Sequence, residues 1–276
     1  MSENEAIRIT AAVPGSTLPR EAQIIRELVR SYYDIQRIRV AYNNRLKRMV
    51  RDGLVLEEAL AETHYGLELR RLSDAEDSLA KRFAAYLKEQ PIWEDWLSRV
   101  RGIGPVLAAG IIAEIGHPSR FETVSKLWAF AGLAVRNGVA CRRTRGEKAN
   151  WSPGFKVLCW KLAHSFVLQG GAYRKEYERF KAHELELHPQ TPDIKPGGKF
   201  SLAHLDLRAQ RKVVKLFLSH LWQRWRELEG LPTRPPYAIE YLKHTSLSDP
   251  ARFATKPAKA ARKKATAPRR KRLKAG

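Results

Sequence analysis

The chain has 276 residues, of which 43% are hydrophobic, so it can bury a core as one large or two modest domains. It holds 51 Lys and Arg against 29 Asp and Glu, and this net charge of +22 points to a polyanionic partner, above all nucleic acid. The two cysteines cannot build a disulfide framework or a four-ligand zinc site, and no apolar run reaches the roughly 18 residues of a membrane span. We therefore expect a cytoplasmic, nucleoid-associated protein without a signal peptide, cofactor, metal or membrane partner.

Residues 1–20 contain two prolines and no periodic pattern, which predicts a flexible arm. Apolar side chains then recur at alternating spacings of four and three from Leu28 to Met49, with Arg39 as the one polar interruption, and Asp52-Gly53 predicts the end of this first long helix. A second periodic stretch runs from about residue 67 to 87. We expect residues 21–90 to form a helical hairpin or a coiled coil, and the chain to form a homo-oligomer through it.

The next predicted domain, residues 91–187, contains the most informative stretch of the sequence, VRGIGPVLAAGIIAEIG. Gly102 and Gly104 permit dihedral angles that larger residues avoid, and Pro105 suits the first position of a helix. The free amides and the positive dipole end of that helix would bind a phosphate. The same steric freedom also suits a plain packing corner. The pattern is that of a helix-hairpin-helix, and we expect residues 101–105 (Arg101, Gly102, Ile103, Gly104, Pro105) to contact a nucleic-acid backbone.

A basic, irregular segment follows a helix that Thr123 or Ser125 would cap and Gly132 would end. Asn137-Gly138 indicates a small two-stranded ribbon near 134–150. The nucleic-acid-binding residues predicted in this segment are Arg136, Arg142, Arg143, Arg145 and Lys148.

Residues 188–250 are predicted to be a C-terminal helical extension, in which Ser201 caps a long helix. One face of this helix carries a basic stripe, which would be a second phosphate contact or a solvated polar face: Arg208, Arg211, Lys212 and Lys215. Trp222 and Trp225 have the spacing of core residues. Residues 251–276 hold 11 Lys and Arg and no acidic residue, half of the net charge, and are predicted to be a disordered basic tail.

The stretch VRGIGPVLAAGIIAEIGHPSRFETVSKLWAFAGLAV, followed by a basic segment and SPGFKVLCWKLA, resembles the C-terminal domain of one family of insertion-sequence transposases, relatives of the pilin-gene invertase Piv. The resemblance covers roughly residues 98–165 and extends to the order and spacing of the motifs. It implies DNA binding linked to transposition or recombination.

Two features of the family are missing from the pattern. The family's nuclease-like domain supplies four metal-binding acids from a βαβ sheet, whereas residues 1–97 have no strand pattern that could hold such acids. The family's serine nucleophile would fall near Ala140. Cys141, whose basic neighbours would stabilise a thiolate, and Ser152 are the remaining candidates for a catalytic role.

The sequence thus predicts an all-α protein with a hairpin arm, a helix-hairpin-helix core, C-terminal helices and a basic tail. Its predicted function is to grip DNA, or structured RNA, as an accessory to or derivative of a transposase. Two alternatives stay open: an active recombinase that works with a partner domain or chain, and a nucleoid or RNA-scaffold protein.

Overall fold

The computed structural model describes residues 18–55, 63–136, 139–142, 144–146, 148–234 and 249–255. Helices dominate these ranges, which confirms the predicted all-α fold class. Several predicted features lie outside the described residues: most of the N-terminal arm, the Asn137-Gly138 turn, Arg143, and the tail from residue 256. Within the described ranges, no helix combines the length and the apolar character needed to cross a bilayer.

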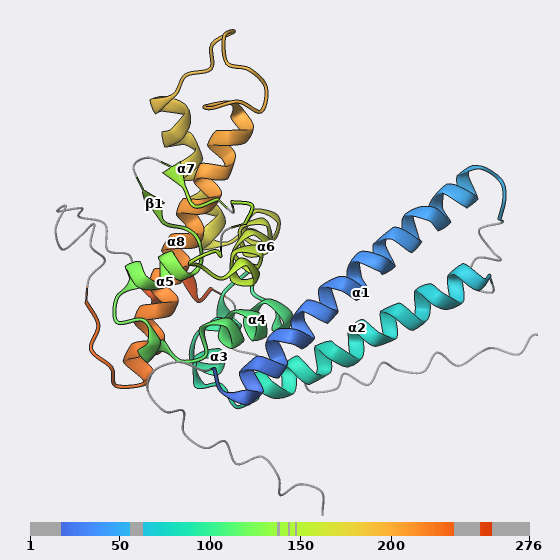
Figure 1. Ribbon diagram of the computed structural model, residues 1–276, viewed down its shortest axis with the longest axis horizontal. Coiled ribbons are helices and arrows are strands. Elements are labelled where there is room, and N and C mark those ends of the chain that lie inside the picture. The colour runs from blue at the N-terminus through green and yellow to red at the C-terminus, as the bar shows by residue number, and fades with distance from the viewer. Residues whose placement is uncertain are drawn as a thin grey trace, which may run out of the picture.

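Two long helices, α1 (Arg20–Arg51) and α2 (His64–Lys88), form a hairpin that projects from the rest of the molecule (Figure 1). Asp52 ends α1, as the sequence predicts. Ile25 and Val29 at the base of α1 are buried in the common core, as is Phe83 of α2. The hairpin is therefore anchored at its base by apolar packing, while its far end extends away from the core.

The centre of the molecule is built from short elements around α4 (Pro105–Ile115) and α6 (Pro153–Gln169). The chain that leads up to Arg101 is divided into α3 (Pro91–Asp95) and the 3-10 helix η2 (Leu97–Arg99), with Trp96 between them. Trp96 is buried and stacks on Phe217, so the chain bends there to insert the indole into the core.

After α4 come the 3-10 helix η3 (Pro118–Arg120), α5 (Val124–Phe130) and the predicted ribbon, whose strands β1 (Val135–Arg136) and β2 (Val139–Ala140) pair antiparallel. Thr123 caps α5 by accepting a hydrogen bond from the Lys126 amide, as predicted. The ribbon is the one departure from helix among the described elements.

A second hairpin, α7 (Ala172–Leu187) and α8 (Leu202–Leu228), diverges from the first one (Figure 1). Ser201 caps α8, and Trp222 and Trp225 are buried, in agreement with the sequence predictions. The prediction of a disordered tail from residue 251 is wrong for its first residues. Residues 250–253 form the 3-10 helix η4 (Pro250–Phe253), which is held because Phe253 is buried against Tyr173 and His220.

Candidate nucleic-acid interface

The glycine corner, which consists of Gly102, Ile103 and Gly104, is fixed against α6. Gly102 has φ +94, and a Cβ at this position would lie 2.9 Å from Cδ1 of Phe166, so both the conformation and the space require glycine. The Ser165 hydroxyl donates a hydrogen bond of 2.6 Å to the Gly102 carbonyl, and Ile103 is buried beneath the corner. The corner is thus a rigid support for the start of α4.

The first turn of α4 presents unused amides. Gly104 is the N-cap and has no side chain to cap the helix, and Pro105 follows at its first position. The first intrahelical bond runs from the Ala108 amide to the Gly104 carbonyl, at 3.0 Å. The amides of Val106 and Leu107 donate to no group in the described part of the chain. The positive end of the helix dipole therefore lies beside two donors that have no partner among the described residues.

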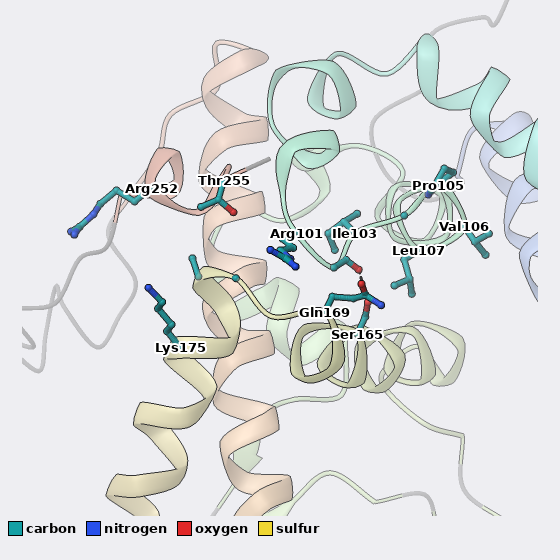
Figure 2. Close-up of a pocket in the computed structure, with 14 residues that line it drawn as sticks. Arg101, Ile103, Pro105, Val106, Leu107, Ser165, Gln169, Lys175, Arg252 and Thr255 are labelled. Atoms are coloured by element: carbon teal, nitrogen blue, oxygen red, sulfur yellow. Dashed lines mark hydrogen bonds between the residues drawn. The ribbon is translucent and has the colours of Figure 1, made fainter. Parts of the chain in front are cut away.

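These amides border a groove of about 880 Å³ that joins four segments of the chain (Figure 2). The start of α4 and Arg101 form one side, and Ser165 and Gln169 of α6 line the middle. Lys175 of α7 and Arg252 of η4 add two more cations. No Asp or Glu is among the described residues that line the groove.

Lys175 and Arg252 were not among the residues predicted from the sequence. They lie about 70 and 150 positions after Arg101, and only the packing of α7 and η4 brings them to the corner. Gly171, at φ +93, allows the close approach, because a Cβ there would lie 3.0 Å from Cβ of Arg101. No local sequence signal predicts that Lys175 and Arg252 lie beside the same groove as Arg101.

The basic segment after α5 lies in the ribbon and in the loop that follows it, and not on the groove. Arg142, Arg145 and Lys148 are exposed, the backbone of Arg136 is in β1, and Arg143 is outside the described residues. None of the described residues of this segment lines the groove. The segment is instead tied to α6, because the Lys156 amine donates a 2.7 Å hydrogen bond to the Cys141 carbonyl.

The stripe on α8 divides into two pairs. Arg208 and Lys212 form ion pairs with Glu184 of α7, at 2.9 and 2.6 Å, and the Glu184 side chain is fully buried. Burial alone would raise the pKa of Glu184, but Lys212 and Arg208 hold it below its usual value. Glu184 is therefore part of the packing between α7 and α8, and this half of the stripe has a structural partner.

The other pair, Arg211 and Lys215, has no such carboxylate in the part of the chain that the structure describes. Both side chains are half-buried, and burial together with repulsion from Arg211 lowers the pKa of Lys215. Burial also lowers the pKa of Arg211 itself. The Lys215 amine lies 4.1 Å from the centre of the Trp128 ring, whose indole nitrogen donates to the Lys215 carbonyl.

The two candidate nucleophiles lie in different surroundings. Ser152 caps α6 by accepting from the Phe155 amide, and its hydroxyl donates a 2.9 Å hydrogen bond to the buried carboxylate of Glu114. Its hydroxyl is therefore engaged in structural contacts. Cys141 is half-buried beside the ribbon. Within the described residues, no three His, Cys, Asp or Glu side chains gather as a metal site.

Comparison with known proteins identifies the central segment. Residues 94–167 match the model of the transposase IS116/IS110/IS902 family. The match begins in α3 and ends in α6, so it includes the corner, the free amides of α4 and Ser165. Lys175, Arg252 and all of α8 lie outside it. A search of curated proteins found no match.

Proposed function

Since residues 94–167 form a domain of the transposase IS116/IS110/IS902 family, we propose that the chain binds the sugar-phosphate backbone of DNA in the corner groove, as part of or accessory to DNA transposition. The free amides of Val106 and Leu107 beside three cations and no acid carry this proposal. Such a surface suits an anion that is held by charge and by backbone donors.

The grip would be largely independent of base sequence. Amides and flexible cations recognise phosphate oxygens, and they carry no pattern that distinguishes one base pair from another. The exposed Arg142, Arg145 and Lys148 and the residues of the tail would add further phosphate contacts. Homo-oligomerisation through the hairpin stays a prediction, as do the recombinase and RNA-scaffold alternatives.

The test is a salt titration of duplex binding with the full chain. A variant with Arg101→Gln, Lys175→Gln and Arg252→Gln removes the three groove cations. Each lost phosphate contact should reduce the slope of log K against log salt by about 0.9. We therefore expect a slope lower by about two to three, with fluorescence anisotropy of a labelled duplex as the measurement.

A matched control removes the same charge elsewhere. Arg45→Gln, Lys47→Gln and Arg48→Gln lie on exposed positions of α1 far along the hairpin. If the control lowers the slope as much as the groove variant does, binding depends on net charge alone and the groove proposal is wrong.

A further inference from the structure

Away from the groove, Arg211 of α8 is near enough to one lysine of α6 and one of α8 that its charge acts on both. We call these three residues the α6–α8 cation cluster: Lys156, Arg211 and Lys215. Lys156 comes from the first turn of α6, and the other two are separated by one turn of α8. Lys156 lies within the matched transposase domain, whereas Arg211 and Lys215 belong to the extension after it.

The contacts of the two lysines hold their amines in place without neutralising them. The Lys156 amine lies 4.4 Å from the centre of the Trp151 ring and donates to the Cys141 carbonyl. The Lys215 amine lies over Trp128. Among the described residues, no carboxylate comes within ion-pair distance of any of the three. Rings and a carbonyl position an ammonium group but leave its charge unbalanced.

Electrostatics shows that this arrangement is costly for the protein alone. Burial, and then repulsion from Arg211, lowers the pKa of Lys156, and the same two causes lower that of Lys215. One turn away on the same helix, Arg208 and Lys212 have the buried carboxylate of Glu184. Among the described residues, the fold therefore supplies an anion for one pair of the stripe and none for the other.

We propose that the α6–α8 cation cluster is a second phosphate site, which binds a phosphodiester of the nucleic acid. This inference rests on the proposed function for the kind of ligand, but it concerns a separate set of residues. A phosphate suits half-buried amines and a guanidinium that lack a carboxylate, because its oxygens accept hydrogen bonds from such groups and its charge balances theirs. The ring faces of Trp128 and Trp151 are covered by lysine amines, so these rings position cations and do not stack on bases.

The experiment compares the full chain with the double variant Lys156→Gln and Lys215→Gln. Anisotropy of a labelled duplex is measured from low to moderate salt. Loss of two phosphate contacts should reduce the salt slope by about two and weaken binding by about eightfold per contact at 0.1 M salt. Lys126→Gln with Lys199→Gln is the matched control, since both are exposed lysines on neighbouring elements, and it should change the slope far less.

Two outcomes separate this inference from the proposed function. If the double variant binds like the wild type while the groove variant is weakened, the cluster is not a phosphate site and the groove proposal stands. If only the double variant is weakened, the cluster stands and the groove proposal fails.

A structural effect of the substitutions is tested by Lys156→Arg with Lys215→Arg, which keeps both charges. Binding restored to within a few-fold of wild type supports the site, and binding as weak as in the glutamine variant overturns it. Inorganic phosphate at millimolar concentration is the second probe. It should compete with duplex for the wild type more strongly than for the glutamine variant, and equal competition counts against the cluster.

Discussion

At the scale of single residues, the two glycines of the corner have different tasks. Gly102 needs its left-handed backbone and the space beside Phe166, whereas Gly104 has an ordinary extended backbone, and a Cβ added there would meet no atom within 4 Å. Gly104 also lines the groove. One glycine therefore supports the fold, and the other keeps the approach to the α4 amides open.

Substitution by alanine should separate these tasks. Gly102→Ala should lower the free energy of unfolding by about 1–3 kcal/mol, since alanine is strained at this φ and its Cβ contacts Phe166. Gly104→Ala should leave stability nearly unchanged but weaken duplex binding, because its methyl group enters the groove. Urea denaturation and anisotropy measure the two effects. Equal loss of stability in both variants would contradict the assignment.

A single carboxylate links α3 to α8 and makes stability depend on pH. Asp95 accepts two hydrogen bonds from Arg224, at 2.6 and 2.8 Å, and these hold the pKa of Asp95 below its ordinary value of 3.8. A carboxyl group whose pKa is lowered on folding stabilises the protein at pH values above its ordinary pKa. This stabilisation is lost as the pH falls through the lower pKa of the folded state.

Asp95→Asn should therefore be less stable than wild type at pH 7, and the difference should narrow as the pH falls below 3.8. Urea midpoints at several pH values from 7 downward are the measurement. Asp34→Asn is the control, because its ion pair with Arg37 is exposed and within one turn of α1, where such pairs contribute little. A difference that stays constant with pH would contradict the role of Asp95.

At the scale of elements, the hairpin contains a polar interruption that the sequence pattern alone does not explain. Arg39 of α1 reaches across to Glu76 of α2 with hydrogen bonds of 2.5 and 3.2 Å, and Glu76 is buried. The pair fixes the register of the two helices, since a slip of one turn would leave the buried carboxylate without its partner.

The expected outcome is strong coupling in a double-mutant cycle. Arg39→Met alone leaves a buried carboxylate unpaired and should destabilise the hairpin by about 1–3 kcal/mol. Arg39→Met combined with Glu76→Leu should recover most of this loss, because both polar groups are then gone. Additive single effects in thermal or urea unfolding would show that the pair does not act as a unit.

The same elements show how far the sequence alone could lead. The sequence identifies features that depend on neighbours a few positions away. These are the caps Thr123 and Ser201, the end of α1 at Asp52 and the start of α4 at Pro105. Long-range contacts are different. The packing of α7 and α8 determines which residues of α8 pair with Glu184. The packing of α7 and η4 places Lys175 and Arg252 beside the groove.

At the scale of the whole molecule, the boundary of the tail matters for dissecting the binding. Residues 249–255 belong to the folded structure, because the Trp96 indole donates to the Pro250 carbonyl and Phe253 is buried. Residues 256–276 carry ten Lys and Arg and no acidic residue. A truncation after Thr255 therefore removes charge without removing η4, whereas one after Pro250 would also take Arg252 from the groove.

We expect the chain that ends at Thr255 to melt like the full chain, to bind duplex more weakly, and to keep a salt-dependent affinity from the groove. The chain that ends at Pro250 should lose further affinity and some stability, because Phe253 is lost from the core. Anisotropy and thermal melting of both chains measure this. Complete loss of binding in the longer chain would place all of the affinity in the tail.

The position of α6 between the two proposed phosphate sites has a geometric consequence. Ser165 follows Lys156 by nine residues, which is about two and a half turns and about 14 Å along the axis, so the two side chains leave opposite flanks of the helix. The outer ridge between these flanks carries Val157, Trp160 and Leu168, each more than half exposed. A backbone that touches both flanks has to pass over this ridge and cover its apolar surface. A nucleic acid too short to do so can occupy only one flank at a time, and the length of the ligand would then decide whether one chain holds one segment or two.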